Sequence, residues 1–357
     1  MKILHVVGAR PNFMKLAPCL RAIATHGGMT QRIVHTGQHY DEAMSESFFR
    51  DLEIPPPDLN LEVGSASHAV QTARIMERFE PVVLEERPDW VVVYGDVNST
   101  AAAAFVCAKL GTKLAHVEAG LRSRDRTMPE EINRLVTDRL ADLLLTPSRD
   151  GDENLLTEGV DPTRIVFVGN VMIDTLLHAL PAARETRFRE SLDVREGEYA
   201  LVTLHRPSNV DEPAKLFRIA TALGAIAREM PVIFPIHPRT RSRLTTADTT
   251  ALGAVRVMDP TPYHATLDLT AGARVVITDS GGLQEETTAL GVPCLTLRDN
   301  TERPVTITEG TNQLVLDLDR LTPLALAARR NGSPKRPEGW DGRAGERVAS
   351  TLWSRAR

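Results

Sequence analysis

The sequence predicts an α/β protein made of two doubly wound domains. Three observations favour this fold class. Short apolar runs alternate with amphipathic helical stretches along the chain, which is typical of parallel sheets covered by helices on both faces. The alternation falls into two successive sets, which indicates two such sheets. A length of 357 residues also exceeds what a single hydrophobic core usually organises.

The first half of the chain contains the strands expected for the first domain. They are short apolar runs at residues 2–7, 32–36, 90–94, 113–117, 143–146 and 165–168. Stretches with apolar residues at helical spacing separate them, for example 15–25, 100–110 and 131–140. The proline-rich loop 51–64 is expected to be irregular. We therefore place the first domain at residues 1–170.

The second half repeats the pattern and gives the second domain, which we place at residues 171–342. Its expected strands are residues 200–204, 232–236, 255–258, 275–278, 293–297 and 313–316, and a long helix is expected over 213–229. Residues 329–342 are interpreted as a connection to a last helix at about 343–357. We expect that helix to pack back on the first domain.

Composition and charge exclude several classes of protein. A net charge of −5 gives no electrostatic reason to expect nucleic acid or acidic membranes as partners. Cys19, Cys107 and Cys294 are too far apart for a zinc site or a disulfide framework, which favours a reducing compartment. The first residues enter a strand without the apolar core of a signal peptide, and no run of eighteen apolar residues occurs. We expect a cytoplasmic enzyme.

The most informative local pattern lies at residues 278–306. A buried strand ends at Asp279, the run Ser280-Gly281-Gly282 turns the chain, and a helix is expected over 283–290. Glycines let backbone N–H groups approach a ligand closely, and the start of a helix adds the positive end of its dipole. Such a turn is also a common structural feature, so alone it is weak.

Acidic and basic residues around this turn strengthen the functional interpretation. Glu285 and Glu286 are expected in the first turns of the helix, and a basic strip at 298–303 follows the next strand. This order suits a nucleotide diphosphate-sugar, with the helix start at the diphosphate, a Glu at the ribose hydroxyls and an Arg at the leaving group. Acids are also good residues near a helix start, which is the plain structural alternative.

Polar residues follow the strands of the first domain where ligands bind in doubly wound sheets. Arg10 and Lys15 follow the first strand in a turn that lacks the three glycines of a dinucleotide fingerprint. Asp96 follows the third strand. Asp96 would be a good helix cap, but Ser99 or Thr100 would serve equally well, which leaves Asp96 free for chemistry.

Two further acids and two histidines occupy similar positions. Glu118 ends an otherwise apolar strand, where a carboxylate is costly unless it is paired or functional, with Arg122 or Arg124 as structural partners. Glu130 follows Pro129, where an acid also suits a helix start. In the second domain, the strand ends carry His205-Arg206 and His237-Pro238-Arg239. A lone histidine there is usually structural, but two with nearby arginines favour a site.

The whole motif set resembles that of the non-hydrolysing UDP-N-acetylglucosamine 2-epimerases, over nearly the entire chain. It consists, in order, of GARPNFMKLAP, TGQHYDE, VVVYGDVNST, HVEAGLRSRDRTMPEEINR, TLHRPSNVD, FPIHPRT and DSGGLQEETTALGVPCLTLRDNTERP. The resemblance implies a GT-B-like fold, with two Rossmann-like domains facing across a cleft. It also implies interconversion of UDP-GlcNAc and UDP-ManNAc without NAD or metal, and a homodimer.

The resemblance also implies roles for individual residues. The reaction would eliminate UDP to give 2-acetamidoglucal and then add UDP back, with proton transfer on both faces of C2. For proton transfer, the resemblance implies Asp96, Glu118 and Glu130. At the leaving diphosphate it implies Arg10, His205, Ser280, Gly281 and Gly282, with Arg303 closing onto UDP and Glu286 at the ribose. Further implied residues are Lys15 near the site, Arg206 and His237 as UDP-sugar contacts, and Gln38 at a second, activating UDP-GlcNAc.

Departures from the family pattern leave alternatives open. Ser208 stands where many relatives have Glu, the segment between Glu118 and Glu130 is slightly short, and Tyr40 replaces a basic residue, which argues against activation. The intact Gly95–Thr100 pattern favours epimerisation over hydrolysis. A UDP-2,3-diacetamido sugar acid remains an alternative substrate. A GT-B glycosyltransferase and a nucleotide-sugar sensor remain alternative functions.

Overall fold

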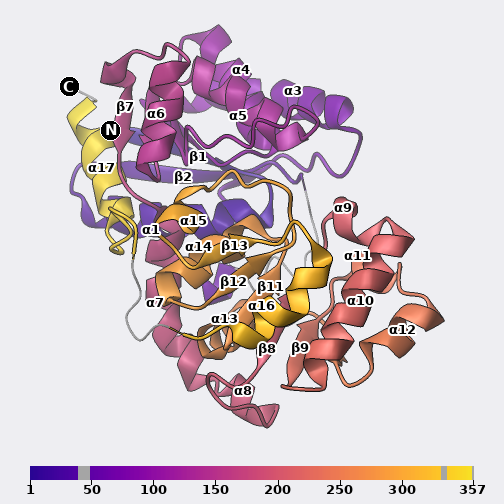
Figure 1. Cartoon of the computed structure of the whole chain (residues 1–357). Coiled ribbons are helices and arrows are strands. Elements are labelled where there is room, and N and C mark those ends of the chain that lie inside the picture. The colour runs from indigo at the N-terminus through magenta and orange to yellow at the C-terminus, as the bar shows by residue number, and fades with distance from the viewer. Residues whose placement is uncertain (39–48, 331–335, 356–357) are drawn as a thin grey trace. The chain divides into compact units, whose positions relative to one another are not determined.

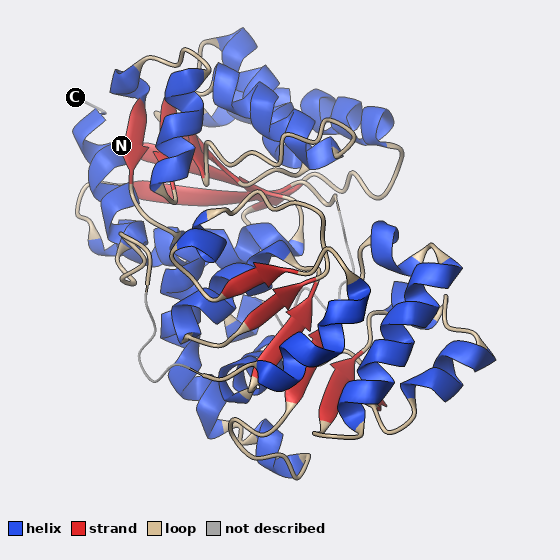
Figure 2. Cartoon of the chain, viewed as in Figure 1, coloured by secondary structure: helices blue, strands red, loops and turns tan. Residues whose placement is uncertain are grey.

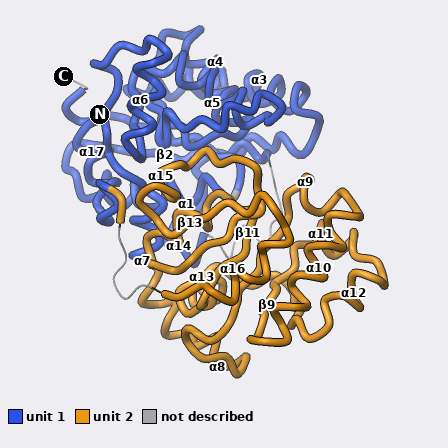
Figure 3. Tube along the Cα trace, viewed as in Figure 1, with its two compact units in different colours: residues 1–178, 338–357 blue, residues 179–337 orange. Residues whose placement is uncertain are grey.

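A computed structural model, which describes residues 1–38, 49–330 and 336–355, divides the chain into two compact units (Figure 3). Unit 1 comprises Met1–His178 and Glu338–Arg357, and unit 2 comprises Ala179–Pro337. The chain passes from unit 1 to unit 2 within α7 (Val171–Glu185). The division therefore falls inside a helix, at residue 178 rather than the expected 170.

Unit 1 contains a parallel sheet in the order β3-β2-β1-β4-β5-β6-β7 (Figure 2). Its strands are β1 (Lys2–Val7), β2 (Thr30–His35), β3 (Leu59–Asn60), β4 (Trp90–Tyr94), β5 (Leu114–Val117), β6 (Leu143–Thr146) and β7 (Ile165–Phe167). The expectation that residues 51–64 are irregular is wrong at Leu59 and Asn60, which pair with Val34 and His35 at the sheet edge. A strand of two residues is too short to show a period-2 pattern.

Helices cover both faces of the unit 1 sheet. They are α1 (Arg10–Thr25), α3 (His68–Glu86), α4 (Asn98–Leu110), α5 (Pro129–Leu140), α6 (Arg149–Thr157) and α17 (Ala344–Arg355). Helices α3, α4 and α5 lie together on one face, whereas α1 packs beside α17 on the other (Figure 1). Helix α1 begins earlier than expected because Pro11 suits a first turn, where its missing N–H has no helical partner.

Unit 2 contains a parallel sheet in the order β10-β9-β8-β11-β12-β13. Its strands are β8 (Ala200–Thr203), β9 (Val232–Pro235), β10 (Arg256–Met258), β11 (Val275–Thr278), β12 (Cys294–Thr296) and β13 (Asn312–Leu314). Alternate residues of β8 enter different cores: Ala200 and Val202 belong to one cluster and Leu201 to the other. Both faces are therefore buried, which explains the continuous apolar runs in the sequence.

The first face of the unit 2 sheet packs on α10 (Pro213–Ala227) and α16 (Leu321–Ala327), and the second on α13 (Tyr263–Gly272). The remaining helices are α8 (Phe188–Ser191), α9 (Pro207–Val210), α11 (Pro238–Arg241), α12 (Thr246–Leu252), α14 (Gly281–Leu290) and α15 (Val305–Thr308). Two doubly wound parallel sheets confirm the predicted fold class.

In each sheet the strand order reverses between two neighbouring strands. This switch lies between β1 and β4 in unit 1 and between β8 and β11 in unit 2. Helices that follow such strands leave in opposite directions, which opens a crevice at the carboxyl ends where ligands bind. The fold thus directs attention to the loops after these four strands.

Candidate active site

In unit 1, two carboxylates follow neighbouring strands. Asp96 comes two residues after the end of β4, and Glu118 directly follows β5. Tyr94 and Val117, the last residues of these strands, are register partners. The sheet therefore places both acids at the same edge, as the sequence analysis expected from the strand ends.

Glu118 is buried and forms an ion pair with the equally buried Lys15 of α1. It adopts φ +74°, a left-handed conformation that is rare for residues other than glycine and that is concentrated at functional sites. Gly95 lies against this pair: a Cβ there would lie 3.0 Å from Oε2 of Glu118 and would meet Nζ of Lys15. Gly95 also adopts φ +60°, so the backbone conformation and the neighbouring ion pair both favour glycine at this position. Arg122 does not pair with Glu118, because it binds Asp138 and Glu158.

Asp96 is held by Arg134, a buried arginine of α5 that the sequence analysis did not single out. Arg134 also donates to Oε2 of Glu131, at 3.1 Å from Nε and 2.7 Å from Nη2. Glu131 in turn accepts backbone N–H groups of Ser123 and Arg124 at 2.9 Å each. The spacing of Glu131 and Arg134 by three residues on a helix was the only signal of this pair. Glu131 thus holds the guanidinium of Arg134, and this guanidinium in turn orients the carboxylate of Asp96.

The cap assignment for α4 differs from expectation. Neither Ser99 nor Thr100 caps this helix, since its cap residue is Val97, without a side-chain bond. Instead, Oε1 of the buried Gln38 accepts the N–H of Ser99 at 3.0 Å and its hydroxyl at 2.7 Å. Gln38, predicted as an activator contact, therefore stabilises the start of α4. Tyr40 lies outside the described residues.

Two other predicted residues of unit 1 are less engaged. Glu130 is exposed at the start of α5, and no hydrogen bond or ion pair joins it to another described residue. Arg10 begins α1, but its side chain lies outside what the structure describes. The structure thus brings Asp96, Glu118 and Lys15 to one edge and leaves Glu130 facing solvent.

In unit 2, a buried carboxylate that the sequence analysis gave no role organises the loop after β8. Asp279 follows β11 and accepts the backbone N–H groups of His205 and Arg206, at 3.1 and 2.9 Å. Its Oδ1 also lies 3.1 Å from Nδ1 of His205. Burial raises the pKa of Asp279. The hydrogen bond from His205 and the charge of that imidazole have the larger effect, so the pKa of Asp279 lies below its usual value.

This contact fixes the tautomer of His205. An ionised carboxylate only accepts hydrogen bonds, so Nδ1 of His205 carries a proton and Nε2 is left for a ligand. The imidazole of His237, which follows β9, lies 5.7 Å from that of His205 between ring centroids. The two predicted histidines are therefore neighbours at the carboxyl edge of the unit 2 sheet. Arg206 stays near them through a 3.3 Å contact from Nε to the carbonyl of Asp279.

At the start of α14, the guanidinium of Arg303 lies beside the first residue of the helix. Ser280 is its cap residue and Gly281 its first residue. A Cβ at Gly281 would lie 2.6 Å from Nη1 of Arg303 and 2.9 Å from Oε1 of Glu302, so only glycine lets Arg303 lie over the helix start. Glu302 forms ion pairs with both Arg303 and Arg298. Burial raises the pKa of Glu302, but the charges of these arginines outweigh it and hold the pKa well below its usual range.

The two glutamates of α14 are both buried but differ in their partners. The helix begins at Gly281, two residues earlier than expected, so Glu285 and Glu286 lie in its second turn and not at its start. Glu285 forms an ion pair with Arg303, at 3.0 Å from Oε1 to Nε. Burial, and secondly the charge of Glu285, raise the pKa of Glu286 to about 8.

We expect Glu286→Gln to stabilise the protein at pH 8.5 and to have little effect at pH 5. The raised pKa means that folding takes up a proton between the ordinary value of 4.5 and about 8. The stability contributed by this group is present below pH 4.5 and is lost as the pH rises through 8. Gln does not titrate. Thermal unfolding of the variant, the parent and the exposed control Glu309→Gln checks this. A melting-temperature difference that does not change with pH contradicts it.

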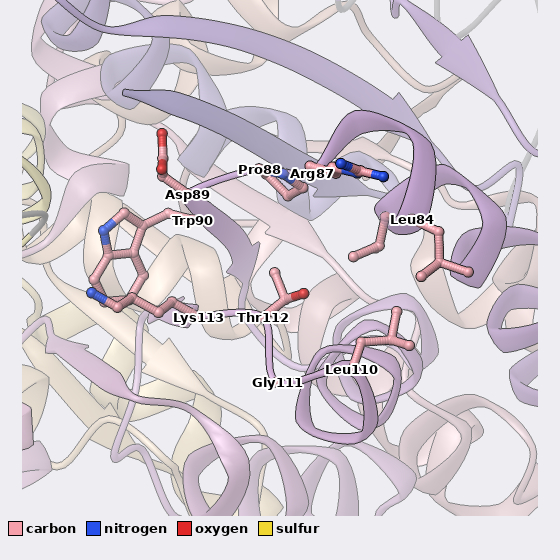
Figure 4. A pocket seen from close by; sticks show the side chains of 10 residues that line it. Leu84, Arg87, Pro88, Asp89, Trp90, Leu110, Gly111, Thr112 and Lys113 are labelled. Carbon is pink, nitrogen blue, oxygen red and sulfur yellow. The ribbon is translucent and has the colours of Figure 1, made fainter.

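A hollow of about 520 Å³ lies at the opposite ends of strands β4 and β5 of unit 1 (Figure 4). It is lined by Trp90, the first residue of β4, and by Lys113, which precedes β5. These are the amino ends of the strands, away from the acids. Among the described residues, no group of three or more His, Cys, Asp or Glu side chains is arranged to hold a metal ion. No helix in the described ranges is long and apolar enough to span a membrane.

Comparison with known proteins places this geometry in context. The model of a family described as UDP-N-acetylglucosamine 2-epimerase matches residues 21–353. The chain is 41% identical over 366 residues to a UDP-N-acetylglucosamine 2-epimerase of Methanocaldococcus jannaschii, with 99% of each covered. It is 43% identical over 321 residues to a UDP-2,3-diacetamido-2,3-dideoxy-D-glucuronate 2-epimerase of Pseudomonas aeruginosa, with 88% of each covered. A crystal structure of the Methanocaldococcus jannaschii UDP-GlcNAc 2-epimerase with UDP-GlcNAc and UDP is similar at a TM-score of 0.89 and 39% identity, covering 99% of this chain and all of that one.

Proposed function

The chain belongs to the UDP-N-acetylglucosamine 2-epimerase family, and we propose that it interconverts UDP-GlcNAc and UDP-ManNAc by inverting C2. The observation that carries this proposal is the pair of carboxylates, Asp96 and Glu118, at the ends of neighbouring strands of unit 1. Each is held by a buried cation, Arg134 or Lys15. A glycosyltransferase or a sugar sensor has little need for two such acids.

The proposed reaction is an elimination followed by an addition. The proton on C2 is not adjacent to a carbonyl, so its direct removal is difficult. Instead, the C1–O bond to UDP breaks as the C2 proton leaves, which gives 2-acetamidoglucal and UDP. UDP then adds back to C1 while C2 receives a proton on the opposite face. Proton-transfer groups are therefore needed on both faces, and we assign them to Asp96, Glu118 and Glu130.

We assign the second set of roles to unit 2. The N–H groups at the start of α14 and the guanidinium of Arg303 suit the departing diphosphate, whose charge they would stabilise. His205, with its tautomer fixed by Asp279, would donate from Nε2 when protonated. Glu286 suits the ribose hydroxyls. The proposed UDP-sugar contacts also include Arg10, Lys15, Arg206 and His237. A second, activating UDP-GlcNAc near Gln38 stays a prediction from the resemblance.

Incubation in D₂O with a single nucleotide sugar tests the function. UDP-GlcNAc alone is expected to give a mixture of two C2 epimers with deuterium at C2, detected by NMR. Because one relative is named for a UDP-2,3-diacetamido sugar acid, that compound is tested in parallel. A higher kcat/KM for the sugar acid would reassign the substrate within the family. Free ManNAc with UDP would indicate hydrolysis, and no change in either sugar would overturn the proposed activity.

We expect epimerase activity to need neither added NAD nor a divalent ion. The elimination proposed here transfers no hydride, and the loop after β1 lacks the dinucleotide fingerprint. Activity after exhaustive dialysis against EDTA should equal that of an undialysed sample. Loss of activity that Mg²⁺ or Zn²⁺ restores would contradict this expectation.

We also propose that the protein is a homodimer. Support comes from large apolar side chains exposed on unit 1: Val70 and Leu84 on α3, with 44% and 56% exposed, and Phe105 on α4, with 40% exposed. Phe105 also lines a hollow of about 250 Å³ between α3 and α4. We propose that Phe105 and this hollow form the centre of an apolar patch, because contiguous patches of that kind mark contacts between proteins.

Light scattering is expected to give twice the chain mass of 39.2 kDa for the parent. Phe105→Glu should halve that mass, because a buried charge at an interface is costly. The matched control is Leu316→Glu on unit 2, where Leu316 is 71% exposed. Equal dissociation in both variants, or none in Phe105→Glu, would rule out this face as the interface.

A further inference from the structure

A second set of buried charges lies in unit 1, against the turn that carries Asp96. His116 of β5 is completely buried. Its Nε2 lies 2.8 Å from the carbonyl oxygen of Gly95, and its Nδ1 lies 2.6 Å from Oδ1 of Asp138 in α5. Gly95 leads directly into Asp96, and Glu118 follows His116 by two residues. One imidazole thus contacts the backbone beside one proposed acid and belongs to the strand that presents the other.

Both partners of this imidazole are hydrogen-bond acceptors. The carbonyl of Gly95 has no proton to donate. The carboxylate of Asp138 already accepts Nη1 of Arg122 at 2.7 Å and the N–H of Gly120 at 3.1 Å, both at Oδ2. The guanidinium of Arg122, paired with this carboxylate in the buried interior, favours its ionised form. Two acceptors need a proton on each ring nitrogen, which makes the ring an imidazolium.

A second buried histidine of the same sheet shows that burial alone does not produce this state. His5 of β1 is also completely buried. Its Nδ1 lies 2.7 Å from the hydroxyl of Tyr94 and its Nε2 lies 3.2 Å from Oε1 of Gln31. A tyrosine hydroxyl can donate as well as accept, so a single ring proton is enough for both contacts. Burial lowers the pKa of His5 to about 4, and this ring is neutral.

We propose that His116 is a positioning residue of the epimerase site, with a proton on each ring nitrogen donated to Asp138 and to the carbonyl of Gly95. Its charge is balanced by Asp138, which Arg122 clamps, and Arg122 is itself held by Glu158 through two contacts of 2.8 Å. The N–H at Nε2 fixes the peptide of Gly95 and so the direction in which Asp96 points relative to Glu118. This inference rests on the proposed function for its kinetic consequence, but not for its protonation state.

Nitrogen-15 NMR of histidine-labelled, full-length protein tests the protonation state without any substrate. The chain has ten histidines, so the signal is assigned by its loss in His116→Gln. We expect protons on both ring nitrogens of His116 at neutral pH, and one proton on the ring of His5. A His116 ring with a single proton at neutral pH would overturn the proposal, whether or not the protein proves to be an epimerase.

Steady-state kinetics test the positioning role. His116→Leu removes both donors and is expected to lower kcat on the order of 10²-fold, with KM and the Kd of UDP within a few-fold, because small misplacements of reacting groups cost about that much. His116→Gln, which keeps an amide donor for Gly95, should recover part of the loss. The matched control is His5→Leu, equally buried in the same sheet, for which a lowered melting temperature and a kcat within about threefold of the parent are expected.

The two variants separate positioning from general stability. If His116→Leu does not fold, the comparison of His116→Gln with His5→Gln decides instead. Equal losses of kcat at His116 and His5, or no loss at His116, would reduce His116 to a structural residue and overturn the proposal. A parent protein that epimerises no UDP-sugar would instead overturn the proposed function, while the NMR result would stand.

Discussion

Replacement of Glu118 by Gln is expected to lower kcat for C2 epimerisation by about 10²–10⁴-fold, the usual contribution of a general acid or base. The Kd of UDP should stay within a few-fold, because Glu118 is not among the proposed diphosphate contacts. Kinetics with UDP-GlcNAc and calorimetry with UDP give the two values. Activity within about threefold of the parent would remove Glu118 from the proton-transfer groups.

The ion pair with Lys15 complicates this substitution, and a control is needed. Both side chains are buried, so Glu118→Gln leaves an ammonium without its carboxylate, which typically costs about 3–5 kcal/mol. The double variant Lys15→Met/Glu118→Gln removes both charges and is expected to recover much of the stability. It should not recover activity. Recovered activity in the double variant would show that the single variant failed through misfolding.

Asp96→Asn is expected to act similarly, but with a smaller effect on stability. The Asp96 side chain is partly exposed, and its partner Arg134 keeps a second carboxylate, Glu131. Glu130→Gln should leave stability unchanged, because Glu130 is exposed and binds no other described residue. A loss of activity in Glu130→Gln therefore reports on chemistry alone, which makes it the cleanest of the three tests.

The strand ends could be predicted because physical chemistry marks them in the sequence. Buried parallel strands form apolar runs, and a run that stops before Asp96, Glu118 or Asp279 marks the carboxyl end of a strand, where ligands bind in folds of this class. The partners of these acids could not be predicted in the same way. Lys15 and Glu118 are separated by several elements, and only the parallel pairing of β1, β4 and β5 brings them together.

Other misses have local causes. Glu131 and Arg134 were not singled out from the sequence, although their three-residue spacing places them on one face of a helix. Ser280-Gly281-Gly282 was interpreted as a turn before a helix, whereas Gly281 already begins it, because nothing in a glycine pair distinguishes the two. Gln38 and Asp279 satisfy backbone N–H groups of other segments, and such long-range capping leaves no periodic signal.

Arg303→Ala is expected to raise the fraction of turnovers that release 2-acetamidoglucal and UDP, in addition to weakening UDP binding. The Arg303 guanidinium lies beside Gly281, between the carboxylates of Glu285 and Glu302. Those carboxylates keep the cation oriented at the start of α14, where we place the departing diphosphate. A fixed cation there stabilises the charge of UDP during the lifetime of the 2-acetamidoglucal intermediate, before UDP adds back to C1. The same cation helps to exclude water.

Product partitioning by NMR, compared at equal conversion, is the measurement. Arg303→Lys keeps the charge but not the planar fork of donors, so it should lie between the parent and Arg303→Ala. The matched control is Arg298→Ala, which removes the other arginine of Glu302 and leaves Arg303 in place. We expect that control to lower stability without changing the partition. A group that retains UDP beside the glycal must alter how often the glycal is released. If Arg303→Ala slows epimerisation but leaves the ratio of released glycal to epimerised product unchanged, Arg303 therefore only binds UDP.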